Sequence, residues 1–267
     1  MRLGVVILLV FACVFANAAN RVVSLAPNIT EMLYAAGAGK QLVGVSSFSD
    51  YPKAATHLPI VANASEINLE KIISLKANWV FVLPENAHAA AMSILRHEGV
   101  HIVLVKVKHL NDIPKTMIQM GKLLGTEKIA KHAAKRWRQR LKQLHTSTKH
   151  LRVFYQLSAK PLLTLGKSSL INEVISRCGG VNVYDQTKGA APEVDVESVI
   201  AQKPDVILIS QFAGDQVDVK EAWRRWTMIP AVLHNRLETI PSSLIDRPGP
   251  RILIGATQIC RALNQAD

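Results

Sequence analysis

The chain has 267 residues, of which 49% are hydrophobic and 19% charged, and its formal net charge is +12. This apolar content excludes an intrinsically disordered protein, and the length is enough for one large domain or for two of about 120 residues with separate cores. The charge is concentrated in one segment, because residues 106–152 contain 13 Lys or Arg against only Asp112 and Glu127.

The N-terminal segment has the pattern of a signal peptide. Arg2 precedes an uncharged run, and Ala16 and Ala18 provide the small-x-small pattern at which signal peptidase cleaves. The run of about 17 residues is shorter than the roughly 20 that a membrane span needs. We therefore predict a signal peptide over residues 1–18 and a soluble mature protein outside the cytoplasm. Cys13 leaves a second possibility open, a lipid-attachment site at that cysteine.

Export changes the interpretation of the cysteines. Without Cys13 only Cys178 and Cys260 remain, an even number in a compartment where disulfides persist. We predict that these two are bonded, which would attach the last helix to the middle of the second half of the chain. The alternative is a pair of separate buried thiols.

Residues 19–108 alternate between short apolar runs and helical patterns. Strands are expected at residues 21–25, 41–46, 79–83 and 101–107, with helices between them. Asn28 and Glu31 are typical of a helix N-cap and its reciprocal partner. Apolar strands that alternate with helices predict a mainly parallel sheet covered on both faces, which would form an N-terminal lobe.

The basic segment has the spacing of a helix with one buried face. Its apolar residues recur at steps of three or four from Ile113 to Leu144, except for a step of five after Leu124. We predict one long helix in a linking region of residues 109–149, with its basic face in solvent. Nucleic acid is not an expected partner, since the chain is exported and Trp137 is the only aromatic residue between the basic positions. Attraction to an anionic membrane surface remains a minor alternative.

The alternation resumes over residues 150–267. Strands are expected at 152–157, 206–209 and 237–241, and helices at 169–177, 220–226 and 250–263. The predicted fold class is therefore α/β, with two lobes that each contain a central, mainly parallel sheet flanked by helices, joined by one long rigid helix.

One stretch of the sequence occurs twice. INLEKIISLKANWVFV begins at Ile67, and VDVESVIAQKPDVILI begins 127 positions later at Val194. Each copy starts a helix with Asn or Asp and places a glutamate, Glu70 or Glu197, in the first turn, where the helix dipole favours a carboxylate. Two explanations stay open: a helix-strand unit used twice for stability, or a surface feature needed on both lobes.

Motifs of catalysis are missing from the sequence. Ser46, Ser47 and His57 suggest a nucleophile and base, but no G-x-S-x-G motif accompanies them. The nine histidines form no H-E-x-x-H motif, and no glycine-rich phosphate loop follows a strand. We predict no enzyme, no resident metal and no cofactor, with a secreted hydrolase as the least favoured alternative.

Several motifs resemble one family along nearly the whole mature chain. They are RVVSLAP from Arg21, GVSSFSDYP from Gly44, NLE from Asn68, RCGG from Arg177 and RPGPRI from Arg247. With these motifs the chain resembles the periplasmic cobalamin-binding proteins of bacterial ABC importers, within the wider class of siderophore, haem and corrinoid carriers.

The resemblance implies a function and a set of sites. It implies a periplasmic, monomeric carrier that binds cobalamin or a related corrinoid between its lobes and delivers it to a dimeric ABC permease with ATPase subunits. Contact with the inner membrane would occur only through the permease. The residues implied are Phe48, Tyr51, Ser243 and Arg247 for the ligand and Glu70 and Glu197 for permease docking.

Some positions depart from the family pattern. Ala64, Leu83 and Ala191 occupy positions where the cobalamin carriers have tryptophans, and Ser243 stands in place of an aspartate.

Because of these departures, two other ligands remain possible, haem and a ferric siderophore. Haem would use a Tyr or His axial ligand, for which Tyr51, His88 and Tyr184 are candidates. A ferric siderophore would use Arg247 and Arg251.

Overall fold

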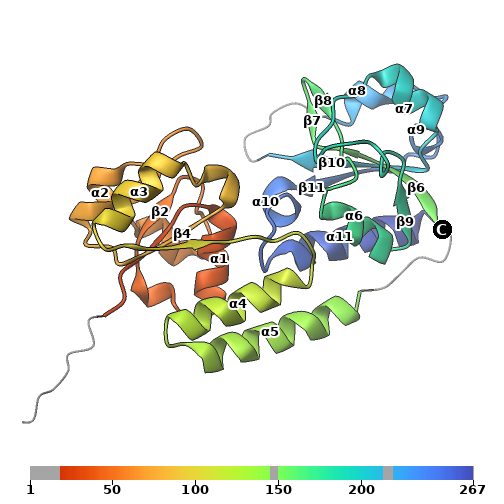
Figure 1. Ribbon diagram of the computed structural model, residues 1–267. Helices are drawn as coiled ribbons and strands as arrows, with labels where there is room; N and C mark the ends of the chain where they lie inside the picture. Colours follow the sequence, from red (N-terminus) through yellow and green to blue (C-terminus); the bar gives the residue numbers. More distant parts are fainter. Residues whose placement is uncertain (1–18, 145–149, 213–218, 267) are drawn as a thin grey trace, which may run out of the picture.

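The structure, a computed structural model, describes residues 19–144, 150–212 and 219–266. The predicted signal peptide, including Cys13, lies outside these residues. The described chain forms two α/β lobes side by side, with a pair of helices packed beneath them (Figure 1). No helix in the described ranges has both the length and the apolar character needed to cross a bilayer. The prediction of two α/β lobes with parallel sheets is confirmed.

The N-terminal lobe contains a five-stranded sheet in the order β3-β2-β1-β4-β5, with every pairing parallel. Its strands are β1 (Val22–Ser24), β2 (Leu42–Ser46), β3 (Ile60–Ala62), β4 (Trp79–Val82) and β5 (His101–Leu104), and its helices are α1 (Pro27–Ala35), α2 (Leu69–Ser74) and α3 (Ala89–His97). Short 3-10 turns occur at Gly39–Gln41, Lys53–His57 and Pro84–Asn86. Successive residues of a strand enter different cores: Val22 packs with α1, whereas Val23 packs with α2 and α3. The strands are therefore apolar on both faces, as the sequence predicted.

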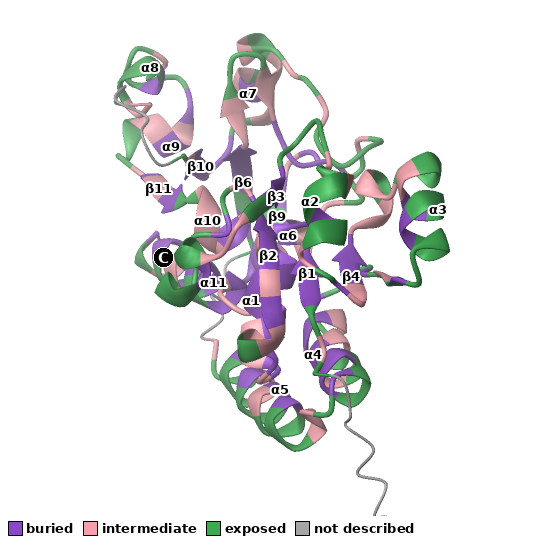
Figure 2. Ribbon diagram, turned by 90° about the vertical axis from the view of Figure 1, so that its left-hand side faces the viewer, coloured by how far each residue is buried: buried purple, intermediate pink, exposed green. Residues whose placement is uncertain are grey.

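The C-terminal lobe contains a four-stranded parallel sheet in the order β11-β10-β6-β9. Its strands are β6 (Leu151–Gln156), β9 (Gly180–Asn182), β10 (Val206–Gln211) and β11 (Leu237–Pro241), and β7 (Ser158–Ala159) and β8 (Leu162–Leu163) form a separate hairpin. Its helices are α6 (Ile171–Arg177), α7 (Val196–Gln202), α8 (Glu221–Arg224), α9 (Pro230–Leu233), α10 (Ser242–Ile245) and α11 (Ile252–Gln265). Residues of α7, α8 and α9 share one apolar cluster on the sheet, while α6 and α11 belong to another. Figure 2 shows the buried residues concentrated in the strands and on the inner helix faces.

The prediction of a single long linking helix is wrong. The segment forms two helices, α4 (Asp112–Leu123) and α5 (Glu127–Lys142), which pack against each other and against α1. Gly125 lies between them with φ +74°, a conformation that an L side chain rarely adopts, so the helix ends there. The step of five residues after Leu124 marks this break in the sequence. Buried residues of α1, α4, α5 and the C-terminal sheet belong to one apolar cluster, so extensive packing joins the lobes.

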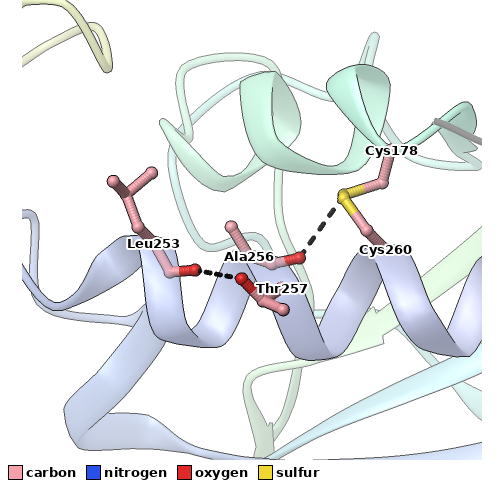
Figure 3. The surroundings of a disulfide bond; sticks show 5 residues. All are labelled: Cys178, Leu253, Ala256, Thr257 and Cys260. Atoms are coloured by element: carbon pink, nitrogen blue, oxygen red, sulfur yellow. Dashed lines mark hydrogen bonds between the residues drawn. A yellow bond between two sulfur atoms is a disulfide. The ribbon is translucent and has the colours of Figure 1, made fainter. Parts of the chain in front are cut away.

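The predicted disulfide is confirmed. Cys178, which follows α6, is bonded to Cys260 in α11, and both residues are buried (Figure 3). The bond therefore joins two helices on the same face of the C-terminal sheet, and the described part of the N-terminal lobe has no counterpart.

Candidate functional site

The loop after β2 presents two aromatic side chains. Phe48 is 75% exposed and has φ +60°, and Tyr51 is 48% exposed. A bulky residue with positive φ is uncommon and costs on the order of 1–3 kcal/mol, which the surrounding structure must offset. An exposed phenylalanine held in this conformation is a candidate ligand contact.

Buried hydroxyl groups anchor this loop. Ser49 Oγ lies 3.1 Å from Thr30 Oγ1 and 3.3 Å from Ser46 Oγ, and Thr30 donates to Ser24 Oγ at 2.8 Å. All four side chains are buried, so each hydrogen bond satisfies a group that water does not reach. The chain on either side of Phe48 is thus fixed to β1, β2 and α1.

Charged residues join this loop to the C-terminal lobe. Arg247 Nη1 lies 2.8 Å from Asp50 Oδ1, and Arg251 Nη2 lies 2.6 Å from Glu31 Oε1 and 3.6 Å from Asp50 Oδ1. The Arg251 guanidinium also lies over the Tyr51 ring, 4.4 Å from its centroid. The two arginines therefore make ionic and cation-π contacts across the lobe junction.

The predicted capping role of Asn28 and Glu31 is wrong. Helix α1 begins at Pro27, its N-cap is Ala26, and no side chain caps it. The reason is that proline fits the first helical position, which moves Asn28 and Glu31 inside the helix. Burial raises the pKa of Glu31 above its usual 4.5, although the hydrogen bond and charge of Arg251 act in the opposite direction. Glu31 is a residue of the lobe junction.

A second buried network supports the C-terminal side of the junction. Asp246, next to Arg247, accepts hydrogen bonds from Tyr155 Oη at 2.7 Å and from Ser210 Oγ. Burial raises the pKa of Asp246, and the two hydrogen bonds partly oppose that shift. Burial and the nearby Asp246 carboxyl also hold the pKa of Tyr155 well above its usual value. These contacts fix the start of the loop that carries Arg247.

The structure brings some of the predicted ligand residues together. Arg247 forms an ion pair with Asp50, the residue that precedes Tyr51 in the chain. No described hydrogen bond or ion pair connects Ser243 to Tyr51 or Arg247. Asp50, which belongs to the motif SSFSDYP, and Asp246 have roles here that local patterns in the sequence do not indicate. Asp50 pairs with Arg247, 197 residues away, and Asp246 accepts from Tyr155 and Ser210, 91 and 36 residues away.

The candidate haem ligands do not form one site. Tyr184 is buried in the C-terminal lobe with its hydroxyl 2.8 Å from Ser198 Oγ, while His88 is exposed before α3. No group of three or more His, Cys, Asp or Glu suited to a metal ion occurs among the described residues. Of the positions that depart from the family pattern, Ala64 and Ala191 are exposed and Leu83 is half-buried.

The repeated sequence forms the same local structure in both lobes. Asn68 Oδ1 accepts from Lys71 N at 2.9 Å at the start of α2, and Asp195 Oδ1 accepts from Ser198 N at 2.6 Å at the start of α7. Of the α-helices in the described ranges, only α2 and α7 have such a side-chain cap. This feature therefore distinguishes the two copies from the other helices.

The ends of the two helices correspond as well. Arg21 Nε donates to Leu75 O directly after α2, and Arg152 Nε donates to the O atom of the matching Gln202, the last residue of α7. Lys76 and its counterpart Lys203 have φ of +50° and +45°. The repeat is thus a complete helix-strand unit in which an arginine is hydrogen-bonded to the C-terminal end of the helix, Arg21 just before β1 in one lobe and Arg152 in β6 in the other.

The two glutamates of the repeat face solvent. Glu70 and Glu197 are exposed in the first turn of their helices and form no ion pair with a residue of the described chain. In both ribbon views α2 and α7 lie on the side of the molecule away from the α4 and α5 pair (Figures 1 and 2). The two helices that carry these acids therefore lie on one side of the molecule, one on each lobe.

Comparisons with known proteins agree with this architecture. A model of the family described as periplasmic binding protein matches residues 22–244. The chain is 36% identical over 253 residues to the vitamin B12-binding protein of Vibrio cholerae serotype O1, covering 93% of this chain and 91% of that protein. It is 34% identical over 252 residues to the vitamin B12-binding protein of Pectobacterium atrosepticum, covering 91% and 88%.

Solved structures show the same fold. The crystal structure of the periplasmic vitamin B12-binding protein BtuF of Vibrio cholerae superposes with a TM-score of 0.83 at 35% identity, covering 93% of this chain and 98% of that one. The periplasmic haem-binding protein RhuT of Roseiflexus sp. RS-1 superposes with a TM-score of 0.82 at 21% identity, covering 93% and 99%, which shows a shared fold alone.

Proposed function

The chain belongs to the periplasmic binding protein family, and from this membership we propose that it captures a corrinoid between its lobes and delivers it to an ABC permease. The relatives are vitamin B12-binding proteins, and we propose that this chain likewise acts as a carrier and not as an enzyme. We place it in the periplasm, exported by the signal peptide expected at residues 1–18.

The observation that carries the proposal is the exposed Phe48, held at positive φ beside the lobe junction. It follows the carboxyl end of β2, and ligands of parallel α/β sheets bind at the carboxyl ends of strands. A large flat ligand gains much of its binding free energy from aromatic contact. Phe48 and Tyr51 would supply that contact, and Arg247 and Ser243 would supply polar groups from the other lobe.

The docking part of the proposal rests on the matched positions of Glu70 and Glu197. A dimeric permease with twofold symmetry presents the same surface twice, so both lobes would need the same acidic group. Exposed ion pairs contribute more to orientation and association rate than to affinity. That balance suits a carrier that must both dock and leave.

Isothermal titration with cyanocobalamin, haemin and a ferric siderophore tests the capture step. We expect saturable binding of cyanocobalamin at one site, and binding at least tenfold weaker in Phe48→Ala because an aromatic contact of roughly 1.5–3 kcal/mol is removed. Leu233→Ala is the matched control, since Leu233 is 65% exposed on α9 and is not a proposed ligand residue. If haemin or the siderophore bound and cyanocobalamin did not, the proposed corrinoid ligand would be wrong, and the ligand that bound would take its place in the proposal.

A further inference from the structure

A cavity of about 650 Å³ lies beside α5 at the lobe junction. Most of the proposed ligand residues are not among the residues that line it. Phe48, Ser243 and Arg247 do not line it, and Tyr51 alone belongs to both sets. The volume is within the range of roughly 300–1,000 Å³ that is usual for small-molecule sites. It is lined by Glu31, Tyr34, Ala35, Tyr51, Pro52, Met117, Ala133, Arg136, Trp137, Arg140, Pro250, Arg251 and Ile254.

The lining is apolar with a positive rim. Among the described residues that line the cavity, the only carboxylate is Glu31, which is paired with Arg251 at 2.6 Å, so these two charges offset each other. Arg136 and Arg140 are exposed and form no ion pair with any carboxylate of the described chain. The Arg136 guanidinium is hydrogen-bonded to His132, which brings no negative charge. Two arginines therefore remain available to an anion.

A second cavity lies beside it along α11, with a more polar lining that includes Gln143, Arg261 and Asn264. It has a volume of about 480 Å³ and shares Arg140 with the first. The α11 walls of the two cavities are adjacent residues, Ile254 in the first and Leu253 in the second. The second cavity also has Leu144 and Cys260 among its lining residues. Both cavities are lined by residues of α5 and α11 and have Arg140 in common, and we call the two together the α5 groove.

We propose that the α5 groove binds an amphipathic carboxylate with an acyl chain, with the carboxylate at Arg136 and Arg140 and the chain against Tyr34, Ala133 and Ile254, which line the first cavity and are partly exposed. The planar guanidinium groups suit a carboxylate because they can form paired charge-assisted hydrogen bonds. The mainly apolar lining of the first cavity suits a chain of methylene groups, each of which contributes about 0.8 kcal/mol when buried.

The site would connect the two lobes. Tyr34 belongs to α1 of the N-terminal lobe, Ile254 belongs to α11 of the C-terminal lobe, and α5 lies against both. A bound acyl chain would contact all three helices. A ligand that binds only the folded arrangement stabilises it, so the melting temperature should rise with ligand concentration.

Decanoate is the probe, and displacement of the fluorescent anion 8-anilinonaphthalene-1-sulfonate from the full chain is the measurement. We expect decanoate to bind saturably with one-to-one stoichiometry and to raise the melting temperature. Arg136→Gln with Arg140→Gln should raise the dissociation constant for decanoate about tenfold, because the paired charges are lost. Both side chains are exposed, so the fold should tolerate the change.

Lys128→Gln with Lys135→Gln is the matched control. Both lysines are exposed on α5 and neither lines the groove, so this variant loses the same charge from the same helix. Its dissociation constant for decanoate should equal that of the wild type. The proposal is overturned if decanoate binding does not saturate, or if the arginine and lysine variants bind it equally. Corrinoid is left out of the assay, so the result does not depend on the capture proposal.

Discussion

The two lobes are alike in one helix-strand unit and differ in how the rest is stabilised. Helices α2 and α7 share a side-chain cap, a first-turn glutamate and an arginine contact at the C-terminal end. Beyond that unit, the C-terminal lobe has a disulfide between α6 and α11, whereas the N-terminal lobe packs α1 against α4 and α5.

This difference favours the functional explanation of the repeat. If capped helices were needed for the stability of an α/β lobe, caps would be expected on other helices too, yet within the described ranges only α2 and α7 carry them. In both lobes the unit carries an exposed glutamate in the first turn of its helix. The lobes diverge at the junction, where each contributes different side chains.

Removal of the disulfide should have the largest effect on stability, and the effect should be greater in the C-terminal lobe than in the N-terminal lobe. Cys178→Ala with Cys260→Ala opens a loop with a sequence separation of 82 residues, and chain entropy predicts a loss of about 4 kcal/mol. Urea denaturation measures the loss, and hydrogen exchange locates it. We expect faster exchange in α6 and α11 and little change in α2 and α3. Equal acceleration in both lobes would contradict the expectation that the disulfide mainly stabilises the C-terminal lobe.

Loss of the buried ion pair at the junction should destabilise both lobes together. Arg251→Met leaves the Glu31 carboxylate without its partner, and the Glu31 side chain is only 2% exposed. Removing one partner of a buried pair costs about 3 kcal/mol.

A matched change at the same junction provides the control. Arg247→Met removes the pair with Asp50, whose side chain is 55% exposed, and should cost less than about 1 kcal/mol. Urea denaturation of both variants checks the order. Equal losses in the free energy of unfolding would contradict the expectation that the buried Glu31 pair contributes more to stability than the exposed Asp50 pair.

The helix caps offer the smallest effect and the most direct comparison of the lobes. Asn68→Ala and Asp195→Ala each remove one hydrogen bond at the start of α2 or α7, and each should cost about 1 kcal/mol. Thermal unfolding of the two single variants measures the costs. If one substitution had no effect while the other had the expected one, the two units would not be energetically equivalent.

The sequence predicted the lobes because their strands are apolar on both faces and the helices between them keep their periodicity. It failed where the outcome depends on distant partners. Glu31 has the spacing of a helix cap, but its partner Arg251 lies 220 residues away. The break between α4 and α5 was visible only as one irregular step after Leu124, and a glycine at Gly125 does not by itself end a helix.

The candidate site was predictable to a similar extent. Resemblance pointed to Phe48 and Arg247, and the structure adds the contact of Arg247 with Asp50 across the junction. The hydroxyl groups beneath Phe48 come from three separate segments that meet only in the folded lobe. Propensity and spacing do not report such contacts, since they describe neighbours along the chain.

The most direct test of the account is the ATPase rate of a reconstituted corrinoid importer in the presence of Glu70→Ala with Glu197→Ala. We predict that this variant still binds cyanocobalamin and no longer stimulates the ATPase. Glu85→Ala with Glu221→Ala, which removes one exposed acid from each lobe outside the repeat, should stimulate as the wild type does. Full stimulation by the Glu70 and Glu197 variant would contradict the claim that the repeated unit exists to meet a twofold partner.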